Sequence, residues 1–281
     1  LVGAMLYDPT VIQSIRGFFG YTGTVTQADC LKLPILLNQI AALFVLFNAF
    51  RFKEESPVKG TFRDAFKGAL IKAFASIKWI RQSQMVLLLL IILMFSESVI
   101  LQFLTLMQQY WKVIDIPILY FGIIGSGLAF SAALIPSLGK LCFKRFTFKT
   151  NFSFCYLNLL IAYCIIALSI RYFGILPVIL LYCTYQLIIY FNSCYIHEAC
   201  EESHRATVLS VQSMLSFSKY GIVSILYSFL VTAISDELVH ASLNQVFQIS
   251  LIAFPSYFAL STLGVFLLVR LYSKHLIQPA P

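Results

Sequence analysis

Long apolar runs separated by short polar segments dominate the chain. A helix that crosses a bilayer needs about 20 predominantly apolar residues, and seven runs approach or exceed that length. They lie at about 33–50, 84–110, 117–139, 151–170, 174–196, 207–233 and 247–272. None of them alternates with the two-residue period of a membrane β-barrel. The pattern therefore predicts an all-α, polytopic transmembrane bundle of about seven helices.

The segment 51–83 interrupts this apolar pattern with eight lysines and arginines. Five apolar residues within it recur at helical spacing, namely Phe62, Phe66, Leu70, Phe74 and Ile77. An apolar stripe surrounded by cations is typical of an amphipathic helix at a membrane surface, and the alternative is a solvated basic loop. Either interpretation predicts a cytoplasmic segment, because Lys and Arg gather on that side of the membrane.

The loop charges agree with an alternating topology that starts from this segment. The loop 140–150 then falls inside, and it carries Lys140, Lys144, Arg145 and Lys149. The loop 234–246 falls outside and contains neither Lys nor Arg. The pattern predicts a protein of the plasma membrane (the inner membrane of a bacterium) with a cytoplasmic C-terminus.

The composition points to the same class of protein. Of the 281 residues, 59% are hydrophobic and 11% are charged, and the mean hydropathy is +0.85. A soluble domain of this size has no means of burying so much apolar surface. The net charge of +8 therefore reflects the cytoplasmic loops, and no nucleic-acid partner is expected. The seven cysteines include no CxxC pair, so neither a disulfide framework nor a zinc module is predicted.

Two of the apolar runs each carry one ionisable residue near the middle, Lys219 in 207–233 and Glu97 in 84–110. Such a group within a span usually faces a partner or a wet cavity and marks an ion or substrate path. At about 100° per residue, the face that contains Lys219 is polar. It includes Gln212, Ser216 and Tyr220. The helix that contains Glu97 has a matching polar arc with Gln102, Thr105 and Gln108.

A third polar stripe follows the run 174–196. It consists of Tyr182, Gln186, Tyr190 and Ser193. Hydroxyl, amide and aromatic groups on one face suit the wall of a cavity for an organic solute, and the alternative is ordinary packing of tyrosines in a bundle.

The stretch HEACEESH at 197–204 contains residue types that bind metals. His197, Cys200, Glu201 and His204 recur at helical spacing, but Glu201 stands where the HExxH motif requires its second histidine. A short polar loop explains the stretch, and the alternative is an intramembrane metal-dependent enzyme. The chain has no nucleophile elbow and no phosphate-binding loop. No enzyme activity, metal or cofactor is therefore predicted.

The order of the segments resembles part of a transporter of the major facilitator superfamily (MFS). One helix, a long basic loop and six further helices match the sixth helix, central loop and second half of that fold. SHRATVLSVQSML (203–215) is similar to the start of its eleventh helix, and QQYWKVIDIPILYFGIIGSG (108–127) to the turn between its seventh and eighth. The superfamily's basic loop motif would fall at GKLCFKRFTFKT (139–150), where its acidic residue is missing. The resemblance divides the chain into 1–50, 51–83 and 84–281.

The resemblance implies that the seventh and eleventh helices are neighbours beside a central cavity, which would allow Glu97 and Lys219 to pair. We expect a secondary active transporter of a small organic solute, working by alternating access, with Glu97 loading and releasing a proton. The alternative for the two charges is a static structural pair. The expected cavity residues are Gln102, Thr105, Gln108, Tyr182, Gln186, Tyr190, Gln212, Ser216 and Tyr220. The expected partners are the solute, protons, the lipid bilayer and the N-terminal half of the same transporter; a non-transporting remnant is the alternative.

Overall fold

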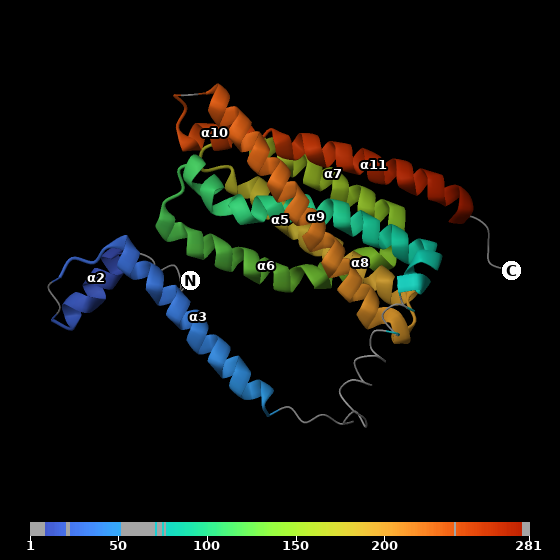
Figure 1. Cartoon of the computed structure of the whole chain (residues 1–281), viewed down its shortest axis with the longest axis horizontal. Helices are drawn as coiled ribbons and strands as arrows, with labels where there is room; N and C mark the ends of the chain where they lie inside the picture. Colours follow the sequence, from blue (N-terminus) through green and yellow to red (C-terminus); the bar gives the residue numbers. More distant parts are fainter. Residues whose placement is uncertain are drawn as a thin grey trace. The chain divides into compact units, whose positions relative to one another are not determined.

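The computed structural model describes residues 9–20, 23–51, 71, 75, 77–238 and 240–276, and within them it contains no strand. The elements are α2 (Pro9–Phe18), α3 (Gln27–Ala49), α5 (Gln84–Val113), α6 (Ile118–Arg145), α7 (Phe148–Ala167), α8 (Ile175–Ala199), α9 (Glu202–Glu237), α10 (Leu243–Ser250) and α11 (Ala253–Leu276) (Figure 1). Six stretches of the described residues are long and apolar enough to cross a membrane, five of them in α5 to α9 and one at Leu243–Leu267. The prediction of an all-helical polytopic bundle is confirmed.

The observed helices differ from the apolar runs mainly at their ends. α6 continues to Arg145, and α9 extends from Glu202 to Glu237. Polar residues can continue a helix beyond its membrane-spanning part, so hydropathy alone underestimates the length. The expected span 33–50 corresponds to the end of α3, where the apolar stretch Ile35–Ala49 is shorter than the other six. The amphipathic helix expected within 51–83 lies mostly outside the described residues.

The expected span 247–272 is divided into two helices. α10 ends at Ser250, and α11 begins at Ala253. Pro255 stands in the first turn of α11, where the missing backbone N–H leaves no helical hydrogen bond unmade. Ser242 starts α10 by accepting a hydrogen bond from the backbone N–H of Gln245 at 3.3 Å.

Contacts divide the chain into two units, Leu1–Lys67 with Ile116–Ala129, and Gly68–Asp115 with Phe130–Pro281. The sequence-based division at residues 50 and 83 stays a prediction. In the first unit, α2 contacts α3, and Ile12, Val25 and Cys30 form a buried cluster.

The start of α3 is fixed by a capping box. The Thr26 backbone N–H and hydroxyl both donate to Asp29 Oδ2, at 3.2 and 2.6 Å. These hydrogen bonds stabilise the charged carboxylate and hold the pKa of Asp29 below its ordinary value.

α5 is the central helix of the second unit. It contacts α8, α9, α10 and α11, and α7 packs against α8 and α11. Phe103 of α5 is fully buried, and its ring lies 5.6, 6.3 and 5.7 Å from the rings of Tyr110, Tyr163 and Phe254. These edge-on aromatic contacts join α5 to α7 and α11. Figure 1 shows α9 crossing α5.

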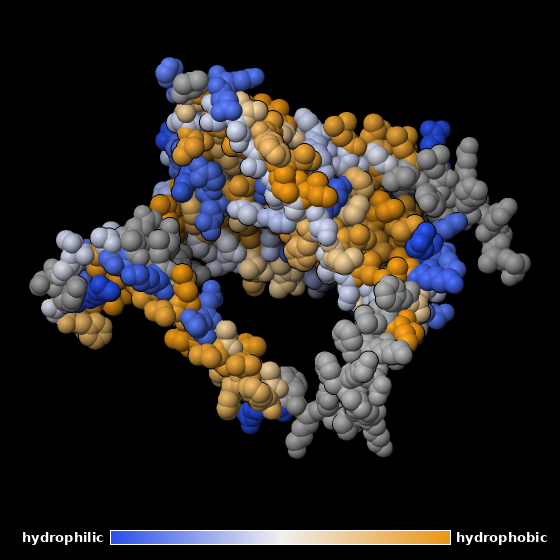
Figure 2. Space-filling model, in the orientation of Figure 1, coloured by the Kyte–Doolittle hydropathy of each residue, from blue (hydrophilic) through white to orange (hydrophobic). Residues whose placement is uncertain are grey.

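The second unit exposes apolar side chains that suit contact with lipid. On α9 they include Phe217, Ile222, Ile225, Leu226 and Phe229, and on α11 Leu260, Leu263 and Phe266. Figure 2 shows hydrophobic residues along both helices. Apolar surface of this extent is unusual in a soluble monomer and ordinary for a membrane protein.

Gly139 marks a close approach of α6 to α8. A Cβ added at Gly139 would lie 2.6 Å from Cδ1 of Tyr190, whereas one added at Gly264 of α11 would meet open space. We expect Gly139→Ala to lower the free energy of unfolding by about 1 kcal/mol or more, because the Tyr190 ring must shift. Gly264→Ala is the matched control and should be neutral or raise it by up to about 1 kcal/mol, since alanine favours helices. Unfolding of both variants in mixed detergent micelles tests this, and equal effects would contradict the close contact.

Candidate functional site

The Lys219 side chain of α9 reaches into the second unit. Its Nζ atom lies 2.8 Å from the ring centroid of Phe95 on α5 and 6.0 Å from that of Tyr257 on α11. Nζ is buried and has no hydrogen-bond partner among the described residues. Aromatic faces attract an ammonium group, but they provide no hydrogen-bond acceptor of the strength that water provides. Lys219 is therefore a buried amine that has no anion beside it among the residues that the structure describes.

Glu97 lies on α5, two residues after Phe95, and has a different neighbour. The Tyr185 hydroxyl of α8 donates a hydrogen bond to Glu97 Oε1 at 3.0 Å. Within the described part of the chain, no ion pair joins Glu97 to Lys219. An ion pair elsewhere in that part links Arg171 Nε to Asp115 Oδ2 at 2.7 Å, near the ends of α7 and α5. The pairing of Glu97 with Lys219 stays a prediction.

Hydrogen bonds link the polar faces of α5, α8 and α9 on either side of Lys219. The Ser224 hydroxyl donates to Gln102 Oε1 at 2.5 Å. The Thr105 and Tyr220 hydroxyl oxygens are 3.1 Å apart. These two contacts place the polar arc of α5 against that of α9.

A third contact of the same kind joins α8 to α9, where Asn192 Nδ2 donates to Gln212 Oε1 at 3.2 Å. Ser216, one turn from Gln212, is buried. From the predicted set, the structure thus brings Thr105 against Tyr220 and Gln102 against the same face of α9, at Ser224. Gln212, Ser216 and Lys219 lie on earlier turns of α9 and contact neither Gln102 nor Thr105 through a hydrogen bond given for the described residues.

The remaining predicted residues lie elsewhere in the described bundle. Gln108 is exposed. Tyr182 and Gln186 are half-buried on α8 without a hydrogen bond to α5 or α9, and Tyr190 packs on α6 at Gly139. Sequence reasoning missed Tyr185, whose position beside Glu97 depends on how α8 packs on α5.

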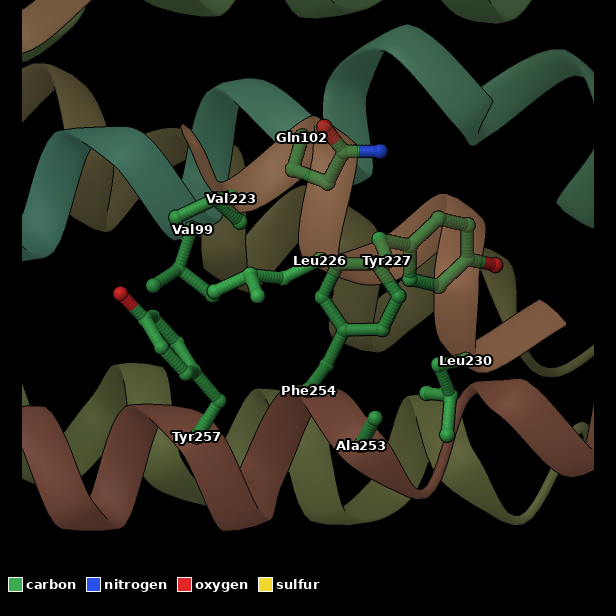
Figure 3. Close-up of a pocket in the computed structure, with 9 residues that line it drawn as sticks. All are labelled: Val99, Gln102, Val223, Leu226, Tyr227, Leu230, Ala253, Phe254 and Tyr257. Carbon is green, nitrogen blue, oxygen red and sulfur yellow. The ribbon is translucent and has the colours of Figure 1, made fainter. Parts of the chain in front are cut away.

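A pocket of about 130 Å³ opens between α5, α9 and α11 (Figure 3). It is lined by Val99, Gln102, Val223, Leu226, Tyr227, Leu230, Ala253, Phe254 and Tyr257. Figure 3 shows Val99 and Tyr257 at one end and Leu230 at the other. Val99 and Val223 follow Phe95 and Lys219 by one helical turn. Phe95 and Lys219 therefore lie one turn before the parts of α5 and α9 that line the pocket.

The stretch 197–204 is not assembled as a metal site. The His204 ring stacks on Trp79 with centroids 4.9 Å apart, and Cys200 Sγ donates to the Glu201 carbonyl at 3.5 Å. Within the described ranges, no group of three His, Cys, Asp or Glu side chains is placed to bind a metal ion. No observation favours the metal-dependent enzyme.

The fold and site define a helical integral membrane protein with ionisable groups inside its bundle. In comparisons with known proteins, no family model, curated protein or solved structure matched the chain.

Proposed function

We propose that the chain is part of a secondary active transporter of a small organic solute, coupled to protons and working by alternating access. The observation that supports this most directly is the placement of Glu97 and Lys219. Each lies near the middle of an apolar helix, both point into one bundle, and they do not neutralise each other. Ionisable groups in such positions are unfavourable in free energy and usually serve an ion or substrate path.

The two side chains suggest a sequence of steps. With Glu97 ionised, the Tyr185 hydroxyl stabilises the carboxylate by donating to Oε1. A proton that enters the bundle would bind this carboxylate and remove its charge. Movement of α9 relative to α5 would then bring Lys219 towards Glu97, and the nearby positive charge would favour release of the proton. Glu97 alternates between two charge states, and Lys219 links that change to helix movement.

The proposal also states which side of the membrane the loops and the C-terminus occupy. The basic loop 140–150 and the C-terminus would be cytoplasmic in a plasma (bacterial inner) membrane, as the distribution of Lys and Arg indicates. The resemblance to the major facilitator superfamily supports the same topology. In this proposal the chain is not an enzyme and its function needs no cofactor.

Proteoliposomes with an internal pH indicator test the proposal. The protein, expressed from its full reading frame, is exposed to a panel of organic acids, bases and neutral solutes. We expect at least one solute to change the internal pH in a saturable manner, because solute and proton cross together. A proton ionophore should abolish its accumulation. Failure of every solute to move, or accumulation that persists with the ionophore, would contradict proton-coupled transport.

A further inference from the structure

Lys219 has no anionic or hydrogen-bonding partner in the described bundle, and this absence points to a ligand. Its Nζ atom is buried between Phe95 and Tyr257 without a hydrogen bond or an ion pair. A buried ammonium without an anion is strongly destabilising, whereas one that binds a carboxylate recovers much of that free energy. The chemistry of the site therefore favours an anionic group and disfavours a cation.

The neighbouring pocket limits what can be attached to that anion. Its lining is almost entirely aliphatic or aromatic, with Gln102 as the one amide side chain. The Gln102 Oε1 atom is already occupied by the Ser224 hydroxyl. The volume of about 130 Å³ is close to the roughly 150 Å³ of an apolar cavity that binds benzene in another protein. The pocket thus has room for an apolar group of the size of one six-membered ring, and it opens to the surface beside Leu226, whose side chain is exposed.

The amine and the pocket share Tyr257 and lie on neighbouring turns of α9. Tyr257 lines the pocket and also lies 6.0 Å from Lys219 Nζ. Val223 lines the pocket one turn after Lys219 on α9. We propose that Lys219 and this pocket together bind a small organic monoanion, a carboxylate attached to a ring or a short branched alkyl group. This rests on the proposed function in that the bound anion is the transported solute.

Benzoate is a suitable probe for the site. Radiolabelled benzoate is titrated against the protein, expressed from its full reading frame, in lipid nanodiscs. We expect saturable binding that cyclohexanecarboxylate displaces and that benzyl alcohol, which has the ring but no charge, does not displace at the same concentration. Benzoate that fails to saturate, or that benzyl alcohol displaces equally well, would overturn the proposal.

Substitutions at Lys219 and Val223 test the amine and the pocket separately. Lys219→Met keeps the length of the side chain but removes the charge, and should weaken benzoate binding by about 10- to 100-fold. Val223→Phe should weaken it similarly by filling the pocket, whereas Lys219→Arg should retain most of the affinity. The controls are Lys144→Met on an exposed lysine of α6 and Ile222→Phe on the exposed face of α9. Binding that survives in both Lys219→Met and Val223→Phe would overturn the proposal.

Transport measured in parallel separates this inference from the proposed function. If benzoate binds in a manner that requires Lys219 but no solute moves with protons, the anion site stands and the transporter proposal fails. If another solute is transported with protons while benzoate does not bind, the transporter stands and the anion site is wrong.

Discussion

Replacing Glu97 by glutamine should reduce proton-driven accumulation of the solute to the level of protein-free liposomes. The glutamine amide oxygen can still accept the hydrogen bond that Tyr185 donates to Glu97 Oε1. The amide has no titrating proton, so the variant can bind solute but cannot load and release a proton. Accumulation under an imposed pH gradient should be lost, while exchange of labelled for unlabelled solute without a gradient should persist.

Glu237→Gln is the matched control, because Glu237 is an exposed acid at the end of α9. It should accumulate solute as the unmodified protein does. Tyr185→Phe should give an intermediate rate, since the carboxylate loses one donor but keeps its proton chemistry. If Glu97→Gln accumulated solute normally, Glu97 would not be the coupling site.

Phe103→Ala should lower the free energy of unfolding by about 2–3 kcal/mol. The ring is fully buried among Tyr110, Tyr163 and Phe254, so its removal leaves a cavity. Lipid tails are as apolar as the protein interior, so moving the ring between lipid and the protein core contributes little to stability. The cavity therefore accounts for most of the lost free energy of unfolding. Titration with a denaturing detergent, followed by helical circular dichroism, measures the difference.

Phe229→Ala provides the comparison for this substitution. Phe229 lies on α9 and its side chain is 70% exposed. Its removal should change the free energy of unfolding by no more than about 0.5 kcal/mol. Equal losses for the two variants would show that the aromatic contacts of Phe103 do not stabilise the bundle.

The sequence predicted the helices well, because a membrane span must satisfy its backbone hydrogen bonds within one apolar segment. The predicted run 174–196 and α8 (Ile175–Ala199) differ by at most three residues. The helix boundaries were predicted less accurately where the apolar composition does not determine the backbone conformation. The break between α10 and α11 falls inside a continuous apolar run, and only Pro255 in the first turn of α11 signals it.

The candidate site was predictable in part. Helical periodicity indicated that Gln212, Ser216 and Lys219 share one face, and the structure turns that face towards the bundle. Periodicity describes one helix at a time, so it cannot specify which residue of another helix lies opposite. The contacts of Lys219 with Phe95 and Tyr257 depend on the packing of three helices, and nothing in the sequence distinguishes these rings from the other aromatic residues.

Among the described residues, three hydrogen bonds between two side chains join α9 to α5 and α8, and they differ in kind from the aromatic packing that joins α5 to α7 and α11. Polar bonds between membrane helices contribute about 0.6 kcal/mol each, so the three together amount to about 2 kcal/mol. A free-energy difference of about 2 kcal/mol leaves the state in which these three hydrogen bonds are broken populated at a few per cent. The polar contacts of α9 can therefore be exchanged by thermal motion, while the aromatic core around Phe103 stays intact.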